Sequence, residues 1–194
     1  MGHSLGGMLS MMAASRRPDL AAGVVLLDSP VIAGWRAHTL RMAKATGLIR
    51  RITPGRVARR RRHHWPSRDA ALEHFARKSV FARWDPRVLD DYVTSVVRQD
   101  GRQWTLGFDR EIEARIYETI PHHLGAVLAR HPLQCPLAFI GGRQSVEVRK
   151  AGVAATRRLA GDRFEWTDGT HLFPMEHPDR AASLVLSMIS RLKA

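Results

Sequence analysis

A serine near the N-terminus lies in a pattern that could carry nucleophilic chemistry. Residues Gly2-His3-Ser4-Leu5-Gly6 fit G-x-S-x-G, the nucleophile elbow, in which a sharp turn between a strand and a helix exposes the serine hydroxyl. A serine hydroxyl is a weak nucleophile at neutral pH and needs an adjacent base. We expect Gly2 and Gly6 to permit the turn, because the backbone would pack too closely there for side chains. Ser4 is therefore the candidate nucleophile.

Only one of the two elements that such a turn needs is evident around Ser4. The segment from Leu5 to Ser15 is rich in Met, Ala and Leu, which predicts a helix buried on several sides. No strand is expected before the turn, because only Met1 precedes Gly2. Further on, Gly23–Asp28 is a short continuous apolar run of the kind that central parallel strands show.

The last third of the chain repeats this alternation of strands and helices. Pro136–Gly141 and Phe164–Thr167 are strand candidates, and Glu147–Ala160 reads as a helix between them. Pro178 begins an amphipathic helix. Strands that alternate with helices in this way predict the α/β class with a parallel sheet.

The middle of the chain is predicted to be helical throughout. Ser67 and Asp85-Pro86 are helix-start signals, and the region holds four of the five tryptophans, which weakly suggests an apolar substrate moiety. The place of a helical insertion between two strands of such a sheet favours its interpretation as a lid. The predicted domains are therefore a partial α/β core of residues 1–34 and 133–194, and a helical cap of residues 35–132.

These motifs resemble the C-terminal half of an α/β-hydrolase-fold protein with a helical cap. The similar stretches are GHSLGG at 2–7, VVLLDSP at 24–30, LAFIGG at 137–142 and GTHLFPMEHP at 169–178. They stand in the family's order of serine, acid and histidine. The resemblance covers nearly all of the chain but only the last strands of the family's sheet. It implies a serine hydrolase that cleaves a carboxylic ester or a related acyl bond of a small-molecule substrate through a Ser-Asp-His triad.

The resemblance assigns the role of base to His171. The chain has ten histidines, and a histidine taken alone is usually structural or exposed. His171 differs because it follows a strand candidate and lies late in the chain, between Gly169-Thr170 and Leu172-Phe173-Pro174. In the family this loop carries the catalytic histidine.

The acid of the triad is open between two residues. Most of the family places it after the strand that follows the cap, in a pattern like G-x-x-D, but here Ser145 stands at the aspartate position. Asp28 ends the strand after the elbow, a position that some branches of the fold use, and we prefer it. Glu147 is the alternative, although it equally suits the first turn of a helix, where a carboxylate complements the dipole.

The oxyanion hole is incomplete by the same comparison. One donor is the backbone N–H of Leu5, and the second normally comes from a loop near the beginning of the fold, which the chain as given does not contain. We therefore expect that the chain is truncated at its N-terminus and that the true start lies upstream. The alternative is a non-catalytic fragment or remnant of the fold.

Composition leaves one further function class open. The net charge is +13, and Arg59, Arg60, Arg61 and Arg62 form a run that could grip nucleic-acid phosphates. No recognised nucleic-acid motif accompanies the run, so a solvated face of the cap is the favoured interpretation.

The remaining features of the sequence point to an ordinary cytoplasmic protein. A single cysteine, Cys135, suits a reducing compartment. No apolar run approaches the roughly 18 residues of a membrane span, and no secretory signal precedes the elbow. No metal or organic cofactor is implied.

Overall fold

The computed structural model describes residues 1–49, 53–121 and 123–193. Within it the chain divides into two compact units. The first unit comprises Met1–Met42 and Pro121–Ala194, and the second comprises Ala43–Ile120. The second unit begins later and ends earlier than the predicted cap of residues 35–132, whose role as a cap stays a prediction.

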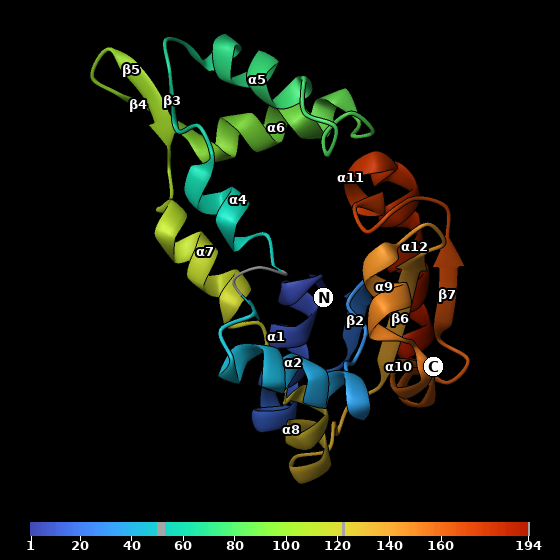
Figure 1. The fold of residues 1–194 in the computed structure, drawn as a ribbon. Coiled ribbons are helices and arrows are strands. Elements are labelled where there is room, and N and C mark those ends of the chain that lie inside the picture. The colour runs from blue at the N-terminus through green and yellow to red at the C-terminus, as the bar shows by residue number, and fades with distance from the viewer. Residues whose placement is uncertain (50–52, 122, 194) are drawn as a thin grey trace. The chain divides into compact units, whose positions relative to one another are not determined.

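A four-stranded parallel sheet organises the first unit (Figure 1). Its strands lie in the order β1 (Gly2–His3), β2 (Val24–Leu27), β6 (Leu137–Gly142) and β7 (Phe164–Thr167). The predicted α/β class with a parallel sheet is confirmed. The expectation that no strand precedes the elbow is wrong, because the two residues before Ser4 pair with the end of β2.

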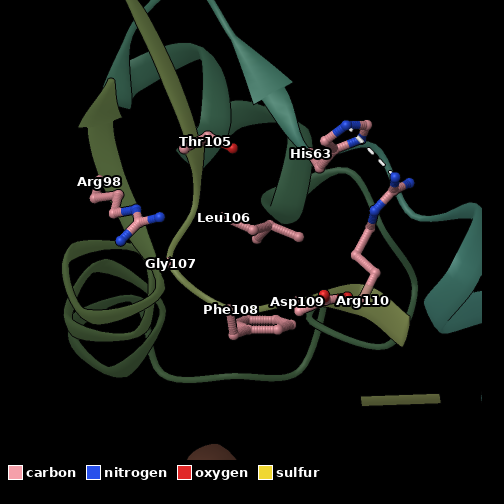
Figure 2. A pocket seen from close by; sticks show the side chains of 8 residues that line it. All are labelled: His63, Arg98, Thr105, Leu106, Gly107, Phe108, Asp109 and Arg110. Atoms are coloured by element: carbon pink, nitrogen blue, oxygen red, sulfur yellow. Dashed lines mark hydrogen bonds between the residues drawn. The ribbon is translucent and has the colours of Figure 1, made fainter. Parts of the chain in front are cut away.

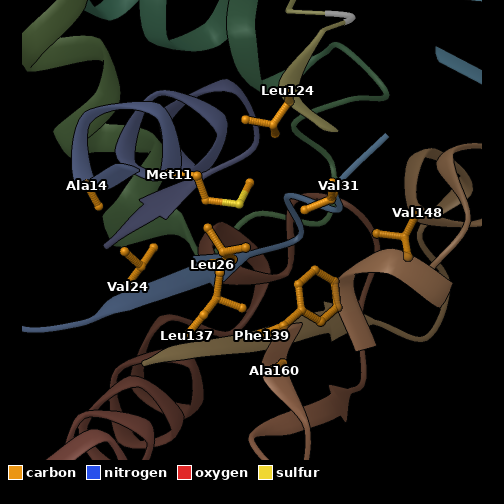
Figure 3. Packing of buried hydrophobic residues seen from close by; sticks show 10 residues of the cluster. All are labelled: Met11, Ala14, Val24, Leu26, Val31, Leu124, Leu137, Phe139, Val148 and Ala160. Carbon is orange, nitrogen blue, oxygen red and sulfur yellow. The ribbon is translucent and has the colours of Figure 1, made fainter. Parts of the chain in front are cut away.

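One face of this sheet packs against four helices that lie between its strands in the sequence (Figure 3). Alternate strand residues, Val24 and Leu26 on β2 and Leu137 and Phe139 on β6, turn toward this face. They meet side chains from α1 (Leu5–Arg16), α8 (Leu124–Arg130), α9 (Val146–Ala151) and α10 (Ala154–Ala160).

The opposite face packs against the C-terminal helices. The intervening strand residues Val25, Leu27, Ala138 and Ile140 contact α11 (Phe173–Glu176) and α12 (Pro178–Lys193) through Phe173, Ala181, Val185 and Met188. Helices on both faces explain why β2 and β6 are continuous apolar runs rather than alternating ones.

The helix predicted over Glu147–Ala160 is two helices, α9 and α10. Gly152 lies between them with φ of +76°, a left-handed conformation that ends α9. The N-cap of α9, at its other end, is Ser145.

The second unit combines helices with a small antiparallel sheet. The helices are α4 (Gly55–Arg60), α5 (Arg68–Ala76), α6 (Pro86–Val96) and α7 (Arg110–Glu118), while α2 (Trp35–Ala45) crosses the boundary between the units. The sheet has the order β3 (His64–Trp65), β5 (Gln103–Leu106) and β4 (Val97–Asp100).

The prediction that this region is helical throughout is therefore wrong. The missed signal is Gly101, the first of the two residues (Gly101-Arg102) that connect β4 to β5, where φ is +59°. The predicted helix starts are confirmed, because the side chain of Ser67 accepts the N–H of Ala70 and that of Asp85 accepts the N–H of Arg87.

Aromatic side chains form the second unit's own core. Trp65 and Phe75 are 1% exposed, and they pack with Trp84, Tyr92 and other residues of α5, α6 and the small sheet. The tryptophans of this unit thus stabilise its fold by burying apolar surface. Trp35 lies outside this core and is 70% exposed, and the expectation that the tryptophans of residues 35–132 indicate an apolar substrate stays a prediction.

No helix in the described ranges combines the length and the apolar character that crossing a membrane requires.

Candidate active site

The three predicted triad residues follow three different strands of the parallel sheet. Ser4 follows β1, Asp28 follows β2, and His171 lies in the loop after β7. Strands that run parallel place their carboxyl ends at one edge of the sheet, which is where ligands bind in open α/β folds. Residues that are 167 positions apart in the chain are brought together in this way.

A continuous chain of hydrogen bonds joins these residues. His171 Nε2 lies 2.9 Å from Ser4 Oγ, and His171 Nδ1 lies 2.6 Å from Asp28 Oδ2. A carboxylate only accepts, so the ring carries its proton on Nδ1, and Nε2 is free to accept the serine proton. This is the tautomer that a general base needs.

The backbone is strained at two of these positions. Ser4 has φ of +52° and Asp28 has φ of +48°, and no other non-glycine residue in the described ranges has a positive φ. Hydrogen bonds hold the turn at Ser4: its N–H donates to Leu27 O at 3.0 Å, and the buried Ser29 hydroxyl donates to Ser4 O at 2.6 Å. The strain is therefore concentrated at Ser4 and Asp28, two of the three candidate residues.

Close packing at the elbow involves one of the two predicted glycines, Gly2, and a second that was not predicted, Gly7. A Cβ on Gly2 would lie 2.3 Å from the carbonyl carbon of Gly6, and a Cβ on Gly7 would lie 2.5 Å from Ser29. A Cβ on Gly6 would meet nothing within 4 Å. The steric reason for glycine therefore holds at Gly2 and Gly7, and the expectation for Gly6 is wrong.

The Asp28 carboxylate is enclosed and fully bonded. The residue is 1% exposed, and its Oδ1 accepts the backbone N–H of Gly142 at 2.7 Å. Its Oδ2 accepts both the Ser145 hydroxyl and His171 Nδ1. The alternative acid, Glu147, is an exposed residue in the first turn of α9, so the geometry favours Asp28 as the partner of His171.

Two further residues hold the histidine loop. The buried carboxylate of Glu176 accepts both the N–H and the hydroxyl of Thr170, at 2.9 and 2.5 Å. His3 Nε2–H donates to the carbonyl of His171 at 2.7 Å, and the two imidazole rings lie 4.8 Å apart. Burial lowers the pKa of His3 below its ordinary value of 6.5, against the opposing effect of this hydrogen bond, so its ring is neutral at pH 7.

The proposed oxyanion donor lies beside the nucleophile. Leu5 is the first residue of α1, so its N–H has no carbonyl partner within the helix. An N–H at this position is available to a negatively charged oxygen bound next to Ser4.

Sequence reasoning missed the residues that hydrogen-bond to the three candidate residues or to the loop around His171. Ser29, Ser145, His3 and Glu176 were given no role, although Ser145 occupies the position of the family's aspartate. That coincidence was the one available signal. The contacts of Ser29 and His3 join segments 25 and 168 positions apart, which no local pattern reveals, whereas the contact of Glu176 with Thr170 lies within one loop.

The second unit contains a separate cationic cavity (Figure 2). It has a volume of about 280 Å³ and is lined by His63, Arg98, Thr105, Leu106, Gly107, Phe108, Asp109 and Arg110. Arg110, the first residue of α7, also donates to the carbonyls of Arg59 and Arg61, so its guanidinium links α7 to the C-terminal end of α4. Ser4, Asp28 and His171 do not line this cavity.

The basic run is partly neutralised by acidic residues of α7. Arg59 pairs with Glu111 and Glu118 at 2.8 and 2.6 Å, and Arg61 pairs with Glu113 at 3.1 Å. Arg62 donates to the carbonyl of His64, and Arg60 is exposed. Two of the four arginines are thus ion-paired within the unit, and a third is hydrogen-bonded there.

Residues 1–49, 53–121 and 123–193 contain no group of three or more His, Cys, Asp or Glu side chains that could hold a metal ion.

Comparison with known proteins agrees with this architecture. Residues 1–184 match the profile described as "Alpha/beta hydrolase family". Because the match spans most of its length, the chain belongs to the alpha/beta hydrolase family.

Individual relatives are distant. The chain is 27% identical over 231 residues to the abhydrolase domain-containing protein AFT2-1 of Alternaria alternata, covering 98% of this chain and 82% of that protein. Among solved structures, E-2-(acetamidomethylene)succinate hydrolase superimposes with a TM-score of 0.70 at 21% identity. An esterase of M. tuberculosis superimposes with a TM-score of 0.67 at 22% identity. At these identities the two solved structures share the fold with this chain.

The chain spans less than two thirds of these two solved proteins. The alignments cover 97% of this chain in both cases, but 65% of the first protein and 61% of the second. The predicted upstream segment stays a prediction.

Proposed function

We propose that this protein is a serine hydrolase that cleaves a carboxylic ester or a related acyl bond. Ser4 is the nucleophile, His171 the general base and Asp28 the acid that orients the base. The observation that carries the proposal is the hydrogen-bond chain from Ser4 Oγ through the imidazole of His171 to the buried Asp28 carboxylate. Membership of the alpha/beta hydrolase family supports it.

The first half-reaction forms an acyl-enzyme. Ser4 Oγ attacks the acyl carbonyl carbon while His171 Nε2 takes the hydroxyl proton, and the carbonyl electrons move onto oxygen. The Leu5 N–H donates to that oxyanion. When the carbonyl re-forms, the bond to the leaving group breaks, and His171 returns the proton to the leaving oxygen.

The second half-reaction releases the acid. Water attacks the acyl-Ser4 carbonyl, His171 takes a proton from the water, and the Ser4 oxygen leaves with that proton. Asp28 remains ionised and stabilises the positive imidazolium in both steps, since it accepts from the protonated Nδ1 throughout.

Covalent labelling tests the nucleophile directly. A fluorophosphonate probe reacts with an activated serine, and we expect one adduct, which mass spectrometry locates on Ser4. Ser4→Ala should abolish labelling and the hydrolysis of p-nitrophenyl esters. The matched control is Ser10→Ala, since Ser10 lies in α1, the helix that follows Ser4, and its hydroxyl donates to the Gly6 carbonyl.

The non-catalytic alternative predicts a different result. A protein with a native circular dichroism spectrum that neither binds the probe nor turns over any ester of the panel would rule out catalysis by the chain as given. Labelling that persists in Ser4→Ala would place the nucleophile elsewhere.

A further inference from the structure

The second oxygen of the Asp28 carboxylate has two donors. Ser145 Oγ and His171 Nδ1 each lie 2.6 Å from Asp28 Oδ2, while Gly142 N–H occupies Oδ1. His171 Nδ1 therefore shares its acceptor oxygen with a second donor, the Ser145 hydroxyl. The carboxylate's charge is divided between the two donors, and its plane is fixed from three directions.

Ser145 is itself held in place by a helix. It is 1% exposed and forms the N-cap of α9, where its oxygen accepts the N–H of Val148 at 3.1 Å. A hydroxyl has a single proton, and an ionised carboxylate can only accept. With the Val148 N–H on one lone pair, the Ser145 proton is directed at Asp28.

The rest of the turn supports this placement. The Ser145 N–H donates to Gly142 O at 3.0 Å, so the same tight turn presents both the Gly142 N–H and the Ser145 hydroxyl to Asp28. A Cβ on Gly142 would lie 2.3 Å from the Thr170 carbonyl oxygen. The backbone of this turn therefore lies directly against the loop that carries His171.

We propose that Ser145 is a positioning residue of the candidate active site, whose hydroxyl orients the Asp28 carboxylate toward His171. The proposal rests on the proposed function of Ser4, His171 and Asp28. Ser145 thus stands at the position of the family's usual acid and supports the acid of the neighbouring strand instead. Without its hydroxyl, Asp28 Oδ2 loses one buried donor and the carboxylate can rotate away from the imidazole.

Three substitutions isolate the hydroxyl. Ser145→Ala removes it, while Ser145→Thr and Ser145→Val have nearly the same shape and differ in its presence, so any overpacking is common to both. We expect kcat to fall on the order of 10-fold to 100-fold in the Ala and Val variants with KM little changed, which is the range for loss of a hydrogen bond to a charged group. The Thr variant should keep most of the activity.

Ser67→Ala is the matched control for helix capping. Ser67 caps α5 in the second unit through the same kind of bond, from the Ala70 N–H to its hydroxyl oxygen. Its loss should leave kcat unchanged. If Ser67→Ala lowers kcat as much as Ser145→Ala, the effect is one of general stability and the proposal is wrong.

A proton NMR readout separates this proposal from the proposed function. The His171 Nδ1–H proton, hydrogen-bonded to Asp28, gives a low-field signal whether or not the protein turns over an ester. We expect Ser145→Ala and Ser145→Val to displace or broaden that signal and Ser145→Thr to retain it. An unchanged signal in the Ala and Val variants would overturn the role of Ser145, even if Ser4 is an active nucleophile. A displaced signal in a protein that never labels would support Ser145 while the proposed function fails.

Discussion

At the scale of single residues, the candidate site depends on which atoms can donate. Asp28 can only accept, so it determines the tautomer of His171, and that tautomer lets the ring accept the proton of Ser4. His3 is partly buried, which lowers its pKa below 6.5, and its ring donates to the backbone carbonyl of the same histidine. Each contact is short and leaves little freedom for another protonation pattern.

The choice between the two candidate acids gives a sharp test. Asp28→Asn keeps the size of the side chain and tolerates the left-handed φ of +48°. It replaces an obligate acceptor by an amide, which allows the wrong tautomer of His171. We expect kcat for ester hydrolysis to fall by about 10⁴-fold.

Glu147→Gln is the control for this substitution, since Glu147 is exposed at the start of α9. It should retain kcat close to that of the unsubstituted protein. A large loss in Glu147→Gln together with a small loss in Asp28→Asn would transfer the role of the acid to Glu147.

At the scale of elements, α4 and α7 are joined by charge as well as by packing. Arg59 on α4 forms hydrogen bonds with Glu111 and Glu118, which stand at the two ends of α7. The Arg59 guanidinium is the main cause that lowers the pKa of Glu111 from 4.5 to about 2, and Arg115 contributes less. The pairing explains how a strongly basic segment folds against its neighbours.

The pH dependence of this pairing can be measured. A carboxyl whose pKa is lowered by folding contributes stability that is present above pH 4.5 and is lost as the pH falls toward about 2. In Arg59→Met we expect the pKa of Glu111, followed by carbon NMR of its carboxyl group, to rise toward 4.5. Arg60→Met is the control, because Arg60 is exposed, and it should leave that titration unchanged. The pairing would be refuted if Arg59→Met left the titration of Glu111 where it was.

At the scale of the whole molecule, the two units have separate apolar cores. Trp65, Phe75 and their neighbours form one core inside Ala43–Ile120, and the two faces of the parallel sheet carry the others. Every apolar contact that defines the aromatic core is made within its own unit. A cavity in one core therefore removes contacts from one unit.

Substitutions in the two cores test this division. Phe75 and Phe139 are 1% and 0% exposed, and truncation of such a side chain to alanine costs about 3–5 kcal/mol in the free energy of unfolding. We expect Phe75→Ala to lower hydrogen-exchange protection chiefly in residues 53–120, and Phe139→Ala to lower it chiefly in the strands of the first unit. Leu186→Ala, at a position that is 65% exposed, should change neither pattern. Equal losses in both units after either substitution would show that they unfold together.

The strongly local features of this protein were predictable from its sequence. Continuous apolar runs identified β2 and β6, and cap residues identified the starts of α5 and α6, because these elements depend on neighbours within a few positions. The elbow motif and the loop around His171 likewise named two members of the site.

Contacts between distant segments were decided only by the tertiary structure. The parallel register of β2, β6 and β7 brings Ser145 and His171 to the carboxylate of Asp28. The two residues are 117 and 143 positions away from Asp28 in the sequence. No local pattern distinguishes Asp28 from Glu147 as the candidate acid. Asp28 directly follows a strand and Glu147 lies in the first turn of a helix, and a carboxylate suits either position. The folded structure buries the Asp28 carboxyl group beside the imidazole and leaves Glu147 exposed, and burial is a property of the folded chain.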